Sequence, residues 1–149
     1  MKKIFLSTFV ALGSIIAFGQ TKINDQTAEQ KLNDQYCTGL FKSANGTILD
    51  LENSPAAGAY SNILDWLDGR VAGLKVYKKR NGTRIPYIRN QVASIFVDEQ
   101  QVNTSYLNSF PASDIAMIKV IRSPFFGGSH AGAGAIAIYT FAVEPVKEE

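Results

Sequence analysis

The chain has few of the side chains that build disulfides, metal clusters and nucleophilic sites, with one cysteine, Cys37, and one histidine, His130, among 149 residues. One cysteine cannot form an internal disulfide, and one histidine beside one cysteine cannot form a His/Cys metal cluster. We therefore expect no metal site and no bound cofactor. We expect Cys37 to be a small buried thiol, with a disulfide to another chain as the alternative, and His130 to lie in a loop.

The chain also lacks an excess of either charge. Fifteen Lys and Arg residues stand against thirteen Asp and Glu residues, and cleavage after residue 19, predicted below, removes Lys2 and Lys3 and leaves the two signs equal. Such a balance favours neither nucleic acid nor an acidic membrane surface as a partner. The local exception is a basic segment over residues 75–84, which we interpret as a solvated hairpin tip, with contact to anionic glycans or lipopolysaccharide as the alternative. Its members are Lys75, Lys78, Lys79, Arg80 and Arg84.

A long hydrophobic run is missing beyond the N-terminus. Residues 1–19 combine a basic start, an apolar run from Ile4 to Phe18 and small residues at Ala17 and Gly19, a pattern typical of a secretory signal peptide cleaved before Gln20. The run is shorter than the about twenty apolar residues that span a bilayer, and an uncleaved anchor is the alternative. We therefore predict an exported protein with no transmembrane segment in the mature chain. No lipid anchor is expected, because the cysteine lies well downstream of the cleavage point.

The mature chain has the length of one small domain. Residues 20–55 form a predicted flexible leader, because Gln20 to Gln35 is too polar to repay the entropy of ordering. Asn45-Gly46, between two short apolar segments, predicts a small hairpin within that leader. The compact domain is expected over residues 56–143, and residues 144–149 form a charged tail.

The compact domain is predicted to be α+β, with a small mixed sheet and one or two short helices. A helix of about two to three turns, capped by Ser61 and ended by Gly69 or Gly73, places Ile63, Leu64 and Leu67 on one face. Apolar and β-branched runs predict strands over residues 74–77, 85–89, 94–97, 101–103, 115–121 and 135–141. The run over 115–121 is expected to be the interior strand. Turns are expected at Asn81-Gly82 and Asp98-Glu99, a helical turn over 106–110, and an irregular loop from Pro124 to Gly134.

Five segments between Tyr60 and Phe141 follow one another in a recognisable order. They are Leu67 to Val76, which contains G-R-V-x-G-L-x-V; Ile88-Arg89-Asn90; Val97 to Val102; Asp114 to Arg122; and Phe126-Gly127 followed by Gly132 to Thr140. Their order resembles the plug domain of TonB-dependent outer-membrane receptors, most closely the SusC-like branch and the plug-like domains found beside carboxypeptidase-regulatory modules. The resemblance implies a plug-like fold and a set of structural motif positions: Gly69, Arg70, Gly73, Arg89, Asp98, Asp114, Arg122, Gly127, Gly132 and Gly134.

The chain departs from the receptor pattern in several places. Asn90 and Glu99 stand where the family uses glycine, so left-handed backbone geometry is disfavoured there, more at Glu99 than at Asn90. A receptor barrel needs about 22 strands, and we expect none in the eight residues after Phe141. The leader also shows no convincing TonB box. The pattern therefore predicts a plug-like domain that stands alone, without its barrel.

Three motifs that suggest chemistry have simpler interpretations. Gly132 to Ala137 fits G-x-G-x-x-A, but the dinucleotide fingerprint needs a helix after it, and a strand is expected here instead. Ser129-His130 lacks a nucleophile elbow, and adjacent side chains seldom face each other. Asp65 and Asp68 read as the solvated side of an amphipathic helix. We predict no catalytic residues and no enzymatic activity.

Two function classes stay open for a non-enzymatic protein of the Gram-negative envelope. The first is an accessory of outer-membrane transport that docks to a β-barrel or receptor protein from the periplasmic side. The second is a free periplasmic module that keeps the plug fold and binds a protein or peptide through a sheet edge. Both place the protein in the periplasm or at the periplasmic face of the outer membrane, and neither identifies a small-molecule ligand.

Overall fold

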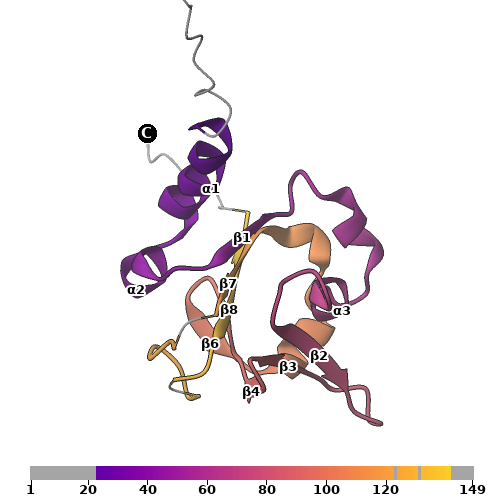
Figure 1. The fold of residues 1–149 in the computed structure, drawn as a ribbon. Coiled ribbons are helices and arrows are strands. Elements are labelled where there is room, and N and C mark those ends of the chain that lie inside the picture. The colour runs from indigo at the N-terminus through magenta and orange to yellow at the C-terminus, as the bar shows by residue number, and fades with distance from the viewer. Residues whose placement is uncertain (1–22, 123, 131, 142–149) are drawn as a thin grey trace, which may run out of the picture.

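Two β-sheets and several short helices form an α+β fold, as predicted (Figure 1). The structure is a computed structural model, and it describes residues 23–122, 124–130 and 132–141. The predicted signal peptide, residues 1–19, and the predicted charged tail, residues 144–149, lie outside the described residues. In the part of the chain that is described, every helix is too short or too polar to cross a lipid bilayer.

The larger sheet has five strands in the order β1-β7-β8-β5-β6. β5 and β8 are parallel, and the other neighbouring pairs are antiparallel. All seven residues of β7 are buried, and the strand lies between β1 and β8. The predictions of a mixed sheet and of an interior strand over residues 115–121 are confirmed. The bounds are β1 (Thr47–Asp50), β5 (Ser94–Val97), β6 (Gln100–Val102), β7 (Ile115–Ile121) and β8 (Ala135–Thr140).

Both faces of the larger sheet are covered, which explains the near-continuous apolar runs of β7 and β8. Because alternate side chains of a strand point to opposite faces, Ile118 and Ile138 join one core, whereas Met117 and Phe96 join the other. The first core contains α3 (Ile63–Leu67), and the second contains residues of α1 (Ile23–Tyr36) and α2 (Gly39–Ser43). Figure 1 shows α1 and α2 on one side of the sheet and α3 on the other.

A separate antiparallel sheet of three strands lies beside α3 and was not predicted as a distinct sheet. It contains β2 (Leu74–Lys78), β3 (Arg84–Ile88) and β4 (Gln91–Val92). Lys78 pairs with Arg84 across the β2–β3 turn, and Gly82 has a φ of 83°, so the predicted hairpin at Asn81-Gly82 is confirmed. Three 3₁₀ helices complete the fold: η1 (Pro55–Ala59), η2 (Thr104–Asn108) and η3 (Ala112–Asp114).

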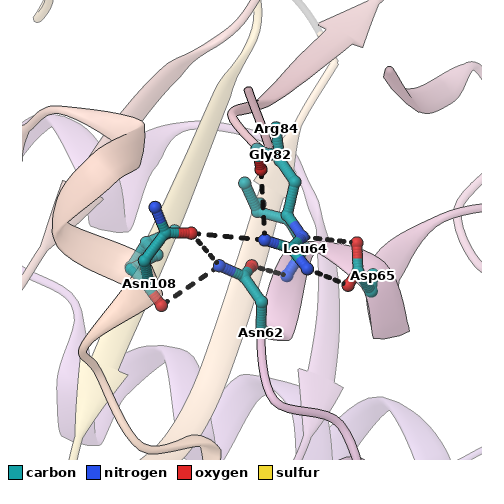
Figure 2. Close-up of polar contacts among 7 residues, drawn as sticks. Asn62, Leu64, Asp65, Gly82, Arg84 and Asn108 are labelled. Carbon is teal, nitrogen blue, oxygen red and sulfur yellow. Dashed lines mark hydrogen bonds and ion pairs between the residues drawn. The ribbon is translucent and has the colours of Figure 1, made fainter. Parts of the chain in front are cut away.

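The start of α3 differs from the prediction. The N-cap is Asn62 rather than Ser61, and the helix has five residues, shorter than the two to three turns expected. Asn62 Oδ1 accepts a hydrogen bond from Leu64 N at 2.9 Å, while its Nδ2 donates to Leu107 O at 3.1 Å and to Asn108 Oδ1 at 3.0 Å (Figure 2). The Asn62 amide both accepts and donates hydrogen bonds, so it caps α3 and joins the helix to η2 at the same time.

Asp65 was predicted to lie on a solvated helix face, but the structure places it in an ion pair with Arg84. Its carboxylate accepts two hydrogen bonds from Arg84, from Nε and Nη2, both at 2.6 Å (Figure 2). The pair joins α3 to β3, and the Arg84 side chain is only 13 % exposed. The hydrogen bonds from Arg84 hold the pKa of Asp65 below its usual value. Arg84, one member of the basic segment, therefore has a structural role in joining α3 to β3. The side chain of Asp68 accepts a hydrogen bond from Val76 N at 2.9 Å.

The leader is helical where flexibility was predicted. α1 and α2 lie over the second face of the larger sheet, where Cys37 and Phe41 are buried and Leu32 and Tyr36 are partly buried. Local hydrophobicity is too low to form this helix alone, and burial against the sheet supplies the missing stabilisation. The predicted hairpin at Asn45-Gly46 is also wrong, because β1 pairs with β7 instead of turning back on α2.

Lys119 is the one charged residue inside β7, and it is 2 % exposed. It points toward the leader, where its Nζ donates to Asn33 Oδ1 at 2.6 Å and to Phe41 O at 2.7 Å. Burial lowers the pKa of this ammonium group. Both partners are neutral, so Lys119 fixes the leader on the sheet at the cost of a desolvated charge.

Candidate functional site

Four of the ten predicted motif positions line one cavity of about 280 Å³. They are Arg89, Arg122, Gly132 and Gly134, and they come from three separate parts of the chain. Arg89 follows β3, Arg122 follows β7, and the two glycines precede β8. Because β8 lies between β7 and β5, strand pairing in the larger sheet brings the loop over residues 124–134, called the glycine-rich loop below, beside Arg122.

A left-handed turn positions Arg89. Arg89 and Asn90 have φ values of 51° and 66°, and the flanking residues Ile88 and Gln91 pair as β3 and β4 turn back. The Arg89 amide donates to Gly73 O at 3.1 Å, which fixes the turn to the start of β2. Asn90 therefore has the left-handed geometry that was expected to be disfavoured there, and asparagine tolerates it better than most residues.

The two glycines of the cavity are required for different reasons. Gly132 has a φ of 89°, and a Cβ there would have no atom within 4 Å. Gly134 would place a Cβ 2.6 Å from Ile121 O and 2.8 Å from Ile88 Cδ1, which leaves no room for a side chain. Gly132 thus supplies backbone freedom, whereas Gly134 allows β7, β8 and Ile88 to approach closely.

The charge of the cavity lining is positive. Arg89 and Arg122 are exposed, and the salt bridges among the described residues are Lys42–Asp34 and Arg84–Asp65, so neither guanidinium has an acidic partner there. No described Asp, Glu, Cys or His residue lines the cavity. Guanidinium groups bind carboxylates through paired hydrogen bonds. The arrangement is therefore suited to holding a carboxylate or similar anion.

Three other motif positions surround the step from α3 to β2. Gly69 and Gly73 have φ values of 74° and 82°, which end the helix and open the strand. Arg70 donates from Nε to Trp66 O at 2.6 Å, and its guanidinium carbon lies 4.6 Å from the centre of the Trp66 ring. These residues hold local structure and do not reach the cavity.

The remaining three positions lie elsewhere. Asp98 is in the β5–β6 turn, and its carboxylate accepts from the Thr140 amide and hydroxyl, both at 2.9 Å. Asp114 accepts through its backbone oxygen from Phe141 N at 3.2 Å. Both therefore secure the far end of β8. Gly127 lies in the irregular loop, where a Cβ would be 2.6 Å from the Phe125 ring.

Glu99 is a structural residue that the sequence interpretation did not assign. Its φ is 66°, so the chain keeps left-handed geometry at a position that the family gives to glycine. The carboxylate accepts from Thr38 N at 2.6 Å, from Thr38 Oγ1, and from Tyr139 Oη at 3.2 Å. Thr38 is the N-cap residue of α2, so Glu99 holds the start of that helix on the sheet. The sequence signal for this residue was a glutamate where glycine was expected, but nothing in the sequence indicated that Thr38 would be its hydrogen-bond partner.

We expect Glu99→Gly to loosen the leader while relieving the turn. Glycine removes the strain of a φ of 66° but also removes the carboxylate that binds Thr38. Because these effects oppose, the global free energy of unfolding should change by less than about 1 kcal/mol. Amide hydrogen exchange over residues 37–44 should nevertheless accelerate at least tenfold. The matched control is Glu99→Gln, which keeps an acceptor and should show the smaller acceleration; equal protection in all three proteins would contradict this role.

The single cysteine and histidine lie where they were expected. Cys37 is 3 % exposed and packs in the second core, and burial raises the pKa of its thiol. His130 is exposed in the glycine-rich loop, where its Nδ1 is 3.4 Å from Ser129 Oγ. The two side chains thus face each other, contrary to expectation, but the contact is exposed. Among the described residues, no group of three or more His, Cys, Asp and Glu side chains could hold a metal ion.

Comparison with known proteins identifies the fold. No protein-family model matches the sequence, and no curated protein matches it. Solved structures do match. The siderophore receptor PirA from Acinetobacter baumannii matches 66 % of this chain with a TM-score of 0.56 and 23 % sequence identity. The ferric yersiniabactin uptake receptor FyuA from Yersinia pestis matches 69 % of this chain with a TM-score of 0.54 and 17 % identity, and the RagAB peptide importer matches 66 % with a TM-score of 0.53 and 19 % identity.

These matches are TonB-dependent receptors, and the aligned region has a plug-like fold. This chain spans a small part of them: 17 % of the PirA chain, 18 % of the FyuA chain and 12 % of the RagAB chain. At such identities the likeness establishes the fold. The small α+β architecture predicted from the sequence is thus the architecture of the plug-like region of outer-membrane receptors.

Proposed function

We propose that this protein is a non-enzymatic plug-fold module of the cell envelope that assists outer-membrane transport by docking to a β-barrel or receptor protein. The observation that carries the proposal is the cavity between Arg89 and Arg122, an anion site without an acidic partner among the described residues. It occurs in a fold shared with uptake and siderophore receptors, in which a plug-like region is one part of a much longer chain.

An acidic protein surface is the partner that this cavity favours. Both arginines line the cavity with exposed side chains, and a carboxylate can accept hydrogen bonds from guanidinium groups. Two motif glycines also line the cavity, and Gly134 lets the backbone pass close to Ile121 and Ile88. Acidic side chains from a barrel wall would complete the ion pairs, and such pairs across an interface contribute several kcal/mol when desolvated.

Capture from envelope extracts tests the docking proposal. The tagged exported protein should recover an outer-membrane β-barrel or receptor, identified and quantified by mass spectrometry. The double variant Arg89→Glu/Arg122→Glu should lower that recovery at least tenfold, which corresponds to about 1.4 kcal/mol or more. The matched control is Lys78→Glu/Lys79→Glu, an equal change of charge at two exposed positions outside the cavity, which should leave recovery within about twofold.

Two results would count against docking at this cavity. One is that the unmodified protein recovers no barrel, receptor or TonB component. The other is that both charge reversals reduce recovery equally, because the effect would then come from overall charge. In the first case the alternative gains support: a free periplasmic module that binds a protein or peptide. The feature that favours this alternative is an unpaired edge of the larger sheet at β6.

A further inference from the structure

A second hollow, larger than the arginine cavity and sharing no residue with it, lies where the two sheets meet. Its volume is about 570 Å³, and β3, β4, β5, β6 and the glycine-rich loop contribute to its lining. Ile85, Val92 and Val102 supply partly buried apolar surface. Asn103 and Thr104 add polar groups at the end of β6. We call this hollow the β6 groove.

The β6 groove runs beside an unpaired strand edge. Among the strands that the structure describes, β6 is the last of the sheet and pairs with β5 alone. Val97 and Gln100 flank the two-residue turn and form the first hydrogen-bonded pair, so Phe96 and Gln101 form the next, non-bonded pair. The N–H and C=O of Gln101 therefore point away from β5, and no other backbone hydrogen bond among the described residues uses them. An extended chain beside β6 would satisfy both groups.

A buried hydroxyl at the wall of the groove is also without a partner. Ser94 is 4 % exposed, and its Oγ makes no hydrogen bond among the described residues. Leaving such a group unpaired costs about 1–3 kcal/mol. The free protein bears this cost in the residue that lines the groove at the start of β5. This is a second observation, independent of the strand edge, that polar groups here lack their partner.

Charge decides which chain fits. His130 lines the β6 groove, but no Asp, Glu, Lys or Arg residue is among the described residues of its lining. A charged side chain that enters it would lose water and would meet none of these four residue types as a partner, which is unfavourable. The apolar surface of Ile85, Val92 and Val102 would instead take an aliphatic side chain. β6 has three residues, which fits a short strand of about three to five residues on the incoming chain.

We propose that the β6 groove binds an extended, uncharged peptide segment, which adds to the sheet as a strand beside β6 and places an aliphatic side chain against Ile85, Val92 and Val102. The segment belongs to a partner protein. The site is separate from the Arg89–Arg122 cavity, and peptide binding here does not depend on docking to a barrel.

Titration of the purified protein with a synthetic peptide tests the site. The probe is Thr-Val-Thr-Val-Thr, acetylated and amidated, followed by amide chemical shifts of the protein. We expect saturable shifts of β6 and β4 residues with a Kd on the order of 100 µM, typical of a small interface. Thr-Lys-Thr-Lys-Thr and Thr-Glu-Thr-Glu-Thr should bind at least tenfold more weakly.

Two substitutions at one position separate the strand edge from the side chain. Gln101→Pro removes the outward N–H, a change that edge strands tolerate, and should weaken binding at least tenfold. Gln101→Ala keeps the N–H and removes the same side-chain contacts to Ser129, so its affinity should stay within about threefold. If Gln101→Pro does not fold, Val102→Lys, which places a charge at the apolar wall, should give the same loss.

The outcomes that overturn the proposal are specific. They are absence of saturable shifts with the neutral peptide, equal affinity for the charged peptides, or equal affinity of the Gln101→Pro and Gln101→Ala proteins. Sedimentation that shows a dimer, with concentration-dependent shifts at the same residues, would assign the groove to a second copy and would also overturn it. Because no envelope component is present, these results are independent of the capture experiment with the arginine variants.

Discussion

Gly134→Ala is expected to lower the free energy of unfolding by about 3 kcal/mol, a large share of the stability of a small domain. The added Cβ would lie 2.6 Å from Ile121 O and 2.8 Å from both Ile88 Cδ1 and Ile88 Cγ2. The Ile121 oxygen belongs to the backbone of β7 and cannot move alone. Gly134 itself accepts a hydrogen bond from Ser94 N at 3.2 Å, so moving the loop away would break that bond. Denaturant unfolding followed by circular dichroism measures the change.

Gly132 provides the matched control, because it is a motif glycine of the same loop with the opposite requirement. Its φ of 89° strains any L residue, but no atom lies within 4 Å of a Cβ. Gly132→Ala should cost about 1–2 kcal/mol, and Gly132→Asn should cost less, since asparagine tolerates left-handed geometry. At Gly134 the order should reverse, with Asn at least as harmful as Ala. Recovery of stability by Asn at Gly134 would contradict the close-approach explanation.

The strands of the core were predictable because their sequence carries the cause of their burial. β7 and β5 match the predicted ranges, and β8 ends one residue earlier than expected. These runs are apolar on both faces, and only a sheet covered on both sides gives such a pattern together with short length. The turn at Asn81-Gly82 was also predictable, because its backbone geometry depends on the two residues themselves.

The leader could not be predicted because its structure depends on a surface that only the folded sheet creates. Nothing in the polar sequence before Cys37 indicates that Leu32 and Tyr36 have a partner. That partner is the second face of the sheet, which includes Met117 and Phe96. The one sequence signal was Lys119 inside an apolar strand, since a buried ammonium group needs acceptors from another segment. Asn33, 86 residues away, provides one of them.

The residues of the arginine cavity were named from the sequence as structural motif positions, and no binding site was predicted among them. The resemblance to receptor plugs identified Arg89, Arg122, Gly132 and Gly134 together with six positions that lie elsewhere. Only the non-local order β7-β8-β5 shows which four converge. The β6 groove carried no motif at all, because its lining comes from two sheets and its chief property is an edge without a partner.

Alkaline pH is expected to unfold the protein through two buried acids, Cys37 and Tyr139. Burial raises the pKa of both groups above their ordinary values of 9.0 and 10.0, and Tyr139 is 2 % exposed. Above those values the unfolded chain loses the protons that the folded chain keeps, so rising pH favours unfolding. Each group lowers the free energy of unfolding by about 1.4 kcal/mol per pH unit in that range.

Lys119 changes the pH at which the loss of stability begins. Burial lowers its pKa below the ordinary value of 10.5, so between that lowered pKa and 10.5 the unfolded chain holds a proton that the folded chain has lost. In that range rising pH favours folding through Lys119, which offsets the loss from Cys37. Above pH 10.5 the contribution of Lys119 is constant. Tyr139 should then lower stability by about 1.4 kcal/mol per pH unit, and Cys37 adds to the slope only while its folded form keeps its proton.

Urea unfolding at intervals from pH 8 to pH 12 measures these slopes directly. Tyr139→Phe should remove about 1.4 kcal/mol per pH unit from the slope above pH 10.5, and Cys37→Ala should reduce the loss of stability that begins above pH 9.0. Tyr77→Phe is the matched control, since it removes the same hydroxyl from a side chain that is 55 % exposed. A slope that is the same in Tyr139→Phe as in the unmodified protein would show that Tyr139 does not control alkaline unfolding.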